Sequence, residues 1–371
     1  MKYLKLLFKA TLGIILLIIL YVGGMIAWNH ATDFQPPLET VVEATAGSER
    51  AVTDTLNLTI WNIGYGGLGQ ASDFFNDGGK STRTTRANTR KNLDAIYQQV
   101  ESWKNDQDFI LLQEVDQSSK RSYLENEMAE MQKRMNGFSS AFAVNYQVAY
   151  VPVPFSDPLG GTLSGLLSLS KATPTQSTRF SFEGNYDWPT YLFFLDRCFL
   201  LQRFPVEGMD RELVVINTHN SAYDDGTLKA KQMAQLRTVL LEEYEAGNYV
   251  IVGGDWNQFP PDFEGFKGYE MPRTAENENL FVKADYPSAD WTWAWDPTTP
   301  TNRDLAAPFD PVATHRQTLD FFLLSPNVEL LEAQATDLQF GPSDHQPVSI
   351  RVALTADTLM AVPADLDAAA E

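Results

Sequence analysis

The sequence contains one cysteine, Cys198. A single thiol cannot form a disulfide within the chain, and it excludes a zinc site built from several cysteines. Its surroundings, DRCFLL, are mostly apolar, which favours a buried structural thiol over a nucleophile. Any chemistry that this chain performs must therefore depend on other side chains.

Basic residues are scarce. The chain has 28 Lys and Arg against 48 Asp and Glu, which gives a formal net charge of −20. The first thirty residues contribute +3, so the remainder carries −23. Because phosphate contacts to nucleic acid need Lys and Arg, this balance argues against tight, nonspecific nucleic-acid binding. It leaves open a nuclease with a local basic patch.

One long hydrophobic run, residues 10–28, carries no charge and follows Lys2, Lys5 and Lys9. At about 1.5 Å per residue, the run is just long enough to cross a hydrocarbon core. The lysines should stay in the cytoplasm, which places the rest of the chain on the far side of the membrane. A cleaved signal peptide is the alternative and would make the protein secreted. The run is long for such a peptide and no clean A-x-A site follows it, so we favour an uncleaved anchor.

Composition divides the chain into four parts. Residues 1–28 form the anchor, and the polar residues 29–54, with two consecutive prolines, are expected to form an extended tether. Residues 55–355 are expected to form one catalytic domain, since 44% hydrophobic residues supply a large core. The alanine-rich, acidic residues 356–371 are predicted to be disordered.

Short apolar segments, predicted as strands from their alternation and their turn residues, repeatedly lead to polar side chains. The carboxyl ends of such strands are where α/β proteins place their chemistry. Helices are expected over residues 119–135 and 226–244, and the second closes a strand-helix-strand unit. The polar residues in or beside these strands are Asn62, Glu114, His219, Asp255, Asn257, Asp320, Asp344 and His345.

These residue types suit phosphoester hydrolysis, which needs a divalent cation, a group that orients or activates water, and an acid for the leaving group. The oxygens of Asn62, Glu114 and Asp344 suit Mg²⁺ or Mn²⁺ better than zinc. His219 and His345 can transfer protons near neutral pH. Taken singly, each residue could equally be a turn cap or a strand-end surface residue.

A local cluster of basic residues follows the glycine-rich segment GYGGLG. It consists of Lys80, Arg83, Arg86 and Arg90, and the last three are spaced to share one helical face. Such a face is more often simply solvated. In so acidic a protein, however, the cluster is the best candidate for recognising a substrate phosphate.

Six segments together resemble the endonuclease/exonuclease/phosphatase superfamily, which contains pancreatic deoxyribonuclease, abasic-site endonucleases, inositol-polyphosphate phosphatases and neutral sphingomyelinases. The resemblance covers residues 56–354 and implies an α/β (α+β) fold, a four-layer α/β/β/α sandwich of two mixed β-sheets. It also implies a magnesium-dependent site at one edge. The matching segments, in the family's order, are Trp61-Asn62, Gln113-Glu114, Asn217–His219, Gly254–Asn257, Leu319–Ser325 and Ser343–His345.

The resemblance assigns roles to the first group of polar residues. Glu114 would be the main metal ligand, assisted by Asn62 and Asp344. Asp255 and Asn257 would orient the attacking water and the phosphate. These assignments come from the matching motifs, and the metal would be Mg²⁺ or Mn²⁺.

The histidines receive less definite roles. The apolar segment TLDFFLL buries Asp320, a carboxylate that needs a partner. By the resemblance that partner is His345, which would act as base or transition-state clamp, while His219 would stabilise phosphoryl oxygens or assist protonation of the leaving group. The residues after His219 and the segment PTNR depart from the family pattern, so Tyr223 and Arg303 could face the substrate or be structural.

We therefore expect a membrane-anchored hydrolase that acts outside the cytoplasm, either a phosphodiesterase or a phosphatase. Its substrate would be a phospholipid headgroup or a small phosphoester. The alternative is an extracytoplasmic endo- or exonuclease that uses the basic cluster. A catalytically inactive binding module is the third hypothesis, although every expected catalytic residue type is present. The sequence does not indicate the oligomeric state.

Overall fold

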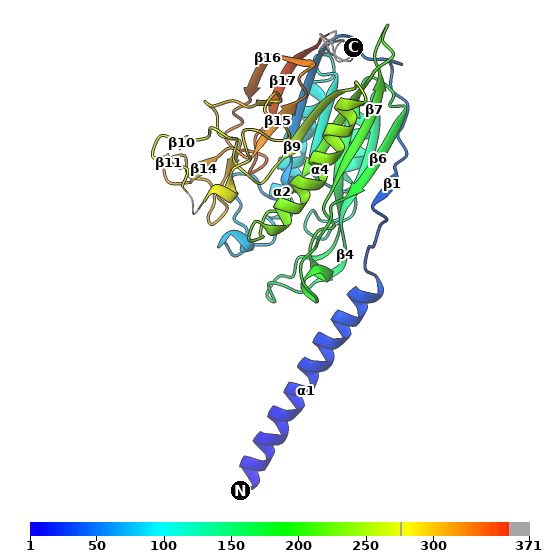
Figure 1. The fold of residues 1–371 in the computed structure, drawn as a ribbon. Helices are drawn as coiled ribbons and strands as arrows, with labels where there is room; N and C mark the ends of the chain where they lie inside the picture. Colours follow the sequence, from blue (N-terminus) through cyan, green and yellow to red (C-terminus); the bar gives the residue numbers. More distant parts are fainter. Residues whose placement is uncertain (275–276, 356–371) are drawn as a thin grey trace, which may run out of the picture.

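The alternation of apolar and polar residues in the predicted strands produces two β-sheets that pack face to face, with helices against both outer surfaces (Figure 1). This computed structural model describes residues 1–274 and 277–355. The predicted four-layer α/β/β/α sandwich is confirmed. The tail predicted over residues 356–371 lies outside the described residues.

One sheet has seven strands in the order β1-β6-β7-β8-β9-β15-β12, and among them only β8 and β9 run parallel. A parallel pair needs a crossover connection, which helix α4 (Thr227–Glu245) supplies on the outer face. The strands are β1 (Glu39–Val41), β6 (Gln176–Ser181), β7 (Cys198–Pro205), β8 (Glu212–His219), β9 (Tyr249–Asp255), β15 (Asp320–Leu324) and β12 (Thr292–Ala294).

The second sheet has six strands in the order β16-β17-β2-β3-β5-β4, with β2 and β3 parallel. Helix α2 (Arg86–Ser102) crosses between them, and α3 (Glu127–Arg134) packs beside it. The strands are β16 (Val328–Ala335), β17 (Val348–Leu354), β2 (Thr55–Asn62), β3 (Phe109–Asp116), β5 (Gly160–Ser170) and β4 (Ser139–Val151). The short elements are β10 (Gly265–Phe266), β11 (Tyr269–Glu270), β13 (Asn302–Arg303), β14 (Arg316–Gln317), η1 (Gly64–Gly66), η2 (Phe75–Asp77), η3 (Thr190–Phe193) and η4 (Glu278–Leu280).

Strand β9 shows why the segment YVIVGG lacks polar residues. Tyr249 and Ile251 belong to the core between the two sheets, whereas Val250 and Val252 belong to the cluster under α4. All four are fully buried, and each such side chain stabilises the fold by about 1.5–3 kcal/mol. A central strand is covered on both faces, so its sequence reads as a continuous apolar run.

Two expectations about helices need correction. The helix expected over residues 119–135 is limited to α3, because Tyr123 and Leu124 adopt left-handed φ angles of 58° and 63°. The basic cluster does not share one helical face, because α2 begins at Arg86 with Thr85 as its N-cap. Arg83 therefore precedes the helix.

The N-terminal hydrophobic run forms α1 (Lys2–Ala31), which extends away from the sandwich (Figure 1). Its length and composition are sufficient to cross a membrane, and none of its most apolar part is buried within the protein. These properties fit a signal anchor or a signal peptide.

The segment predicted as a tether, residues 29–54, is extended and lies along the sandwich. Within it, β1 pairs with β6, and Ala44 and Val52 form isolated bridges to Ala141 and Val206. The segment is therefore part of the folded body and does not act as a free linker.

Asn29 attaches α1 directly to strand β4. Its Nδ2 donates to the carbonyl of Tyr150 (2.9 Å), and its Oδ1 accepts from the Tyr150 N–H (3.1 Å). The Trp28 ring stacks on the Tyr150 ring with centroids 6.5 Å apart. Asn29 is 2% exposed, so the end of α1 is fixed to the body at this point.

A buried charge network supports the end of β3. The Arg121 guanidinium donates to both oxygens of Asp116, at 2.9–3.3 Å, and its Nη1 lies 3.6 Å from Glu114 Oε2. The Asp116 backbone N–H donates to Glu127 Oε2 at 2.8 Å. Burial raises the pKa of Glu127 well above its usual range, and the Asp116 charge adds to the effect. Only Arg121 supplies positive charge to this group.

We expect Arg121→Met to lower the free energy of unfolding by about 3 kcal/mol, because it leaves buried carboxylates without their counter-charge. Thermal unfolding of the full-length protein in detergent measures the change. The matched control is Arg90→Met, which removes an arginine paired with Glu125 at 3.4 Å on the surface. The control should change stability by less than about 0.5 kcal/mol. Equal effects of the two variants would contradict this account.

Asp196 lies just before β7, beside Asp33 from the segment after α1. Burial raises the pKa of the Asp196 carboxyl to about 7, and the charge of Asp33 adds to the effect. The folded state therefore holds a proton that the unfolded chain releases near its ordinary pKa of about 4. Stability should fall as the pH rises from 4 to 7.

Replacing Asp196 by Asn keeps the neutral shape at every pH. Relative to the parent, Asp196→Asn should raise the free energy of unfolding at pH 8 by an amount on the order of 2 kcal/mol, which thermal unfolding measures. At pH 4.5 the two proteins should differ little, because Asp196 is then protonated in the folded parent. A stabilisation that is the same at both pH values would show that burial of this charge is not its cause.

Candidate active site

The register of the seven-stranded sheet brings three of the predicted residues together. His219 on β8 and Asp320 on β15 are both paired with Asp255 on β9. All three side chains are buried. Residues far apart in the sequence therefore become neighbours at one end of this sheet.

The second sheet brings Asn62 and Glu114 to the same place. Asn62 is paired with Gln113 across β2 and β3, and the Gln113 Nε2 donates to Asn217 Oδ1 on the facing sheet (2.7 Å). This buried hydrogen bond joins the two sheets beside the site. The predicted meeting of these strand ends is therefore found in the structure.

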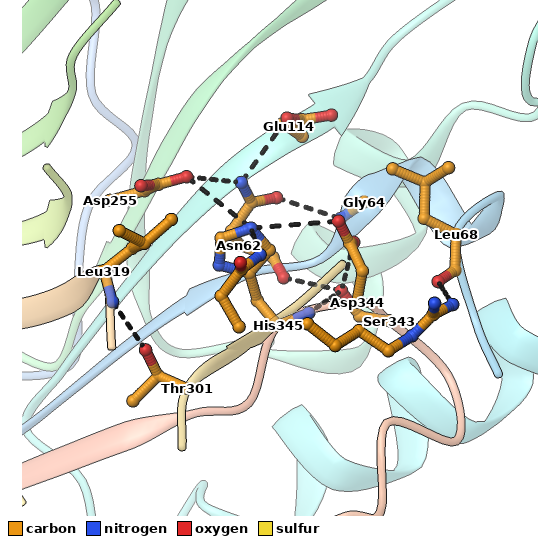
Figure 2. A network of polar contacts seen from close by, with 12 residues as sticks. Asn62, Gly64, Leu68, Glu114, Asp255, Thr301, Leu319, Ser343, Asp344 and His345 are labelled. Carbon is orange, nitrogen blue, oxygen red and sulfur yellow. Dashed lines mark hydrogen bonds and ion pairs between the residues drawn. The ribbon is translucent and has the colours of Figure 1, made fainter. Parts of the chain in front are cut away.

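Asn62 is the centre of a polar network that connects the two sheets (Figure 2). Its Nδ2 donates to Asp255 Oδ2 at 3.0 Å and lies 3.4 Å from Glu114 Oε1. Its Oδ1 accepts from the N–H of Gly64 at 3.0 Å. At Gly64, with φ of 52°, a Cβ would lie 2.8 Å from Asp344 Oδ1. Only glycine fits beside these groups.

His345 and Asp320 form the predicted imidazole–carboxylate pair, with Nδ1 and Oδ2 2.8 Å apart. The other ring nitrogen, Nε2, lies 3.7 Å from Asp255 Oδ2 and 3.8 Å from Asp344 Oδ2. Burial acts to lower the pKa of His345, but the neighbouring carboxylates, that of Asp320 foremost, outweigh it and raise the pKa well above its usual range. Trp61 Nε1 donates to the His345 carbonyl and fixes the backbone (3.0 Å).

Asn302 contacts the same ring and was not singled out by the sequence. Its Nδ2 lies 2.9 Å from His345 Nε2, while Gln317 Nε2 donates to its Oδ1 (2.8 Å). If the ring carries a proton on Nδ1 alone, Nε2 accepts a hydrogen bond from the Asn302 amide. If both ring nitrogens carry a proton, the Asn302 amide must turn over so that its oxygen accepts from Nε2. The unassigned segment PTNR was the only sequence signal for this contact.

His219 has the opposite electrostatic setting. Burial, reinforced by the positive charge of Arg197, lowers the pKa of His219 well below its usual range. Its Nε2 lies 3.4 Å from Asp255 Oδ2, and its Nδ1 has no hydrogen-bond partner among the described residues. Burial thus favours the neutral imidazole of His219, and its unpartnered Nδ1 is itself buried.

Two site residues have left-handed backbones. Glu114 has a φ of 55° and lies where the pairing of β3 with β5 is interrupted by a bulge. Asn257 has a φ of 49°, and its Nδ2 donates to the carbonyl of Asn220 at 3.0 Å. Such conformations cost about 1–3 kcal/mol each and occur preferentially at functional sites. A bulge also re-aims the side chain that it carries.

The donor set fits a hard divalent cation. Burial raises the pKa of the Asp344 carboxyl to about 7, and the nearby Glu114 charge adds to the effect. Ligand atoms of Asp255, Asp320 and His345 all lie within 4.8 Å of one another, which is close enough to hold a metal ion. Two members of this set, Asp320 and His345, are already hydrogen-bonded to each other. The predicted ligands are a different set, Asn62, Glu114 and Asp344, and that assignment stays a prediction.

A cleft of about 650 Å³ contains the site. Of the side chains predicted to bind phosphate, Tyr223 and Arg303 line the cleft. The Tyr223 hydroxyl donates to Asp77 Oδ1 at 3.1 Å. The Arg303 guanidinium is 1% exposed and donates to backbone carbonyls, including those of Leu68 and Gly69. Arg303 therefore has a structural role in this loop.

The basic cluster lies elsewhere. Among the described residues that line the cleft, Lys80, Arg83 and Arg86 are absent. Arg83 pairs with Asp157 at 2.6 Å, and Arg86 lies over the ring of Tyr123. Their expected role in phosphate recognition has no support from this arrangement.

Two arginines that the sequence reasoning missed line the cleft instead. Arg121 lies 3.8 Å above the Tyr65 ring. Arg197, which precedes β7, donates to the His219 carbonyl at 3.5 Å, and within the described part of the chain no carboxylate lies within ion-pair distance of it. The sequence did not indicate either arginine, because neither lies directly after a predicted strand and neither belongs to the basic cluster.

Comparison with known proteins gives a consistent result. A family model described as "Endonuclease/Exonuclease/phosphatase family" matches residues 60–345. No curated protein matches the chain. Among solved structures, an endonuclease/exonuclease/phosphatase from Beutenbergia cavernae is similar, with 16% identity over 82% of this chain and 72% of that one and a TM-score of 0.50.

Two further structures share the fold. The human Nocturnin catalytic domain with bound sulfate has 18% identity, covers 85% of this chain and 98% of its own, and gives a TM-score of 0.50. ANGEL2, a 2′,3′-cyclic phosphatase in complex with adenosine-2′,3′-vanadate, has 15% identity, coverages of 85% and 99%, and a TM-score of 0.52. Because the family model spans most of the chain and every segment of the site, this protein belongs to the endonuclease/exonuclease/phosphatase family.

Proposed function

We propose that this protein is a metal-dependent hydrolase of phosphoester bonds, a phosphodiesterase or phosphatase that is displayed on the outer side of a membrane. The observation that carries the proposal is the convergence of Asn62, Asp255 and His345, together with Glu114 and Asp344, in one cleft. They come from separate strands and loops of both sheets and form one connected polar network.

Glu114, Asp344 and Asn62 would hold Mg²⁺ or Mn²⁺. These are oxygen donors, which suit hard cations, and the raised pKa of Asp344 reflects the burial of its carboxylate near that of Glu114. The Asn62 amide, turned over, would present its oxygen beside Glu114. A cation bound there polarises the phosphoryl oxygen and stabilises developing negative charge.

The remaining side chains would handle water and phosphate. Asp255 lies between the two histidines, which is the position of a group that orients a nucleophilic water. His345, oriented by Asp320, would clamp the phosphoryl oxygens or take the proton of the water. His219, which lines the cleft with its Nε2 close to Asp255, would contact the phosphate or assist the leaving group. Asn257 lines the same cleft.

Arg197 is our preferred residue for recognising the substrate phosphate. It faces the cleft without a carboxylate partner in the described structure, whereas Arg83 is already paired. A guanidinium can bind two phosphate oxygens at once. Tyr223, 47% exposed at the cleft, would add a hydrogen bond from its hydroxyl. This leaves the nuclease alternative without the basic cluster on which it relied.

Metal dependence can be tested without measuring turnover. Mg²⁺ or Mn²⁺ at 100 times its Kd should raise the stability of the parent by about 2.7 kcal/mol in thermal unfolding. Glu114→Gln should lose this increase and reduce phosphoester hydrolysis by about 100-fold or more. The matched control is Glu125→Gln, which changes a half-exposed glutamate outside the cleft and should retain both properties. A parent that neither binds these ions nor needs them would refute the proposed metal dependence.

The substrate class is tested by supplying the full-length protein in micelles with Mg²⁺ and either plasmid DNA or sphingomyelin and lysophospholipids. We expect lipid hydrolysis without DNA cleavage. His345→Ala should remove nearly all turnover while the protein remains folded, and His30→Ala, at the exposed end of α1, should not. DNA cleavage without lipid hydrolysis would reverse the choice in favour of a nuclease. An unchanged rate in His345→Ala would refute the role of this histidine.

A further inference from the structure

The cleft does not end at the polar site. From Glu114 it continues past Arg121, which lies 3.6 Å from Glu114 and over the ring of Tyr146. The Tyr146 hydroxyl donates to the carbonyl of Phe193 at 2.9 Å. Tyr146 thus marks the point at which the polar part of the cleft changes into an apolar part.

We call this second part the apolar end. Four of its side chains pack in one cluster, in which Phe193 and Leu195 of the segment before β7 lie against Val151 and Leu159 of the β4–β5 hairpin. They line the same cleft as the site residues. The apolar end consists of Val151, Val153, Leu159, Phe193, Phe194 and Leu195.

The anchor helix forms part of the wall. Met25 of α1 lines the cleft, and α1 contacts both β4 and η3. Since Asn29 and Trp28 fix α1 on Tyr150, Met25 is held beside the apolar end. Met25 lies near the end of the hydrophobic run, where a membrane-spanning helix would leave the hydrocarbon core. Figure 1 shows α1 leaving the body next to the lower end of β4.

Exposed apolar side chains surround this opening. Val153 and Phe155, in the β4–β5 connection, are 42% and 80% exposed. Trp188, which precedes η3, is 65% exposed. Large apolar side chains grouped around a cleft mark an interaction surface, and aromatic rings prefer the membrane–water interface. Val153 lines the same cleft as Met25 of α1, and α1 contacts η3, which follows Trp188, so a bilayer around α1 is the surface that these side chains are suited to meet.

We propose that the substrate is a membrane phospholipid that enters the cleft from the bilayer alongside α1. Its phosphate would reach Glu114 and His345, and its hydrocarbon would occupy the apolar end next to Met25. This inference rests on the proposed function, because it names the substrate class for the same site. It adds that α1 is a wall of the substrate path as well as an anchor.

The charges of the cleft favour a lipid over a polyanion. A nucleic-acid strand needs a series of cations along its backbone. Within the described lining, the arginines are Arg121, Arg197 and Arg303, and of these Arg121 and Arg303 are engaged with a carboxylate or with backbone carbonyls. One available arginine matches the single phosphate group of a lipid, and the apolar end offers a surface for its hydrocarbon.

The lipid path can be mapped in Glu114→Gln, which would leave the lipid uncleaved. The full-length variant is placed in phosphatidylcholine vesicles that contain phosphatidylcholine with a diazirine on its acyl chain, and it is irradiated and digested. Mass spectrometry should find adducts in residues 151–159 and 188–195 in addition to α1. Adducts confined to residues 1–24 would overturn the inference, and this result does not depend on enzyme activity.

The second measurement compares two substrates in one full-length protein. Bis(p-nitrophenyl) phosphate reports the site from solution, and vesicles of equal parts phosphatidylcholine, phosphatidylethanolamine and phosphatidylglycerol report entry from the bilayer. Val153→Asp should lower the ratio of lipid to soluble turnover at least tenfold. Leu331→Asp, on the distant strand β16 and similarly exposed (46% against 42%), should leave the ratio unchanged.

The outcomes separate the two proposals. If the parent hydrolyses neither of these diesters nor the monoester p-nitrophenyl phosphate with Mg²⁺ or Mn²⁺, the proposed function itself fails. If it hydrolyses the monoester alone, it is a phosphatase and the lipid path fails. If the parent hydrolyses the soluble diester but none of the three lipids, or if Val153→Asp leaves the ratio unchanged, the lipid path fails and the hydrolase remains. Cleavage of DNA in place of lipid would have the same meaning for the path.

Discussion

The cleft depends on a fold that holds several carboxylates close together in a buried site. Asp255 and Asp320 lie opposite each other on adjacent strands, and Glu114 and Asp344 approach from the other sheet. Their mutual repulsion is offset by donors placed among them, of which Asn62 and His345 are the closest. The divalent cation that we propose would balance these carboxylate charges.

The rigidity of the sandwich makes this concentration of charge possible. The hydrogen bond between Gln113 and Asn217 joins the sheets beside the site, and fully buried side chains such as Ile60 and Ile251 fill the space behind it. Strained backbones at Glu114 and Asn257 persist because the surrounding strands leave them no alternative. The core thus holds the proposed metal ligands and the proposed water-orienting groups in fixed positions.

The relation between the cleft and α1 gives this family fold a particular setting. A soluble hydrolase needs only the polar end of the cleft, whereas here the same cleft continues to Met25 of a helix suited to a membrane. The rigid attachment through Asn29 means that the cleft and the helix keep a fixed orientation. In the proposed lipid hydrolase, this short segment of chain would couple the cleft to the membrane.

Local sequence determined the strands, the hydrophobic run and the polar residues at the strand ends, because these depend on alternation, turn residues and side-chain chemistry within a few positions. The six motifs between Trp61 and His345 were also sufficient to indicate the family and its sandwich fold. The sequence did not indicate which arginines line the cleft, since a cationic cluster such as Arg83 with Arg86 says nothing about which acids lie nearby in space. Only the tertiary structure showed that Arg83 is paired with Asp157, that Arg197 faces the cleft, and that Asn302 contacts His345. These contacts join residues that are distant along the chain, and which of them form is decided by strand register and sheet packing.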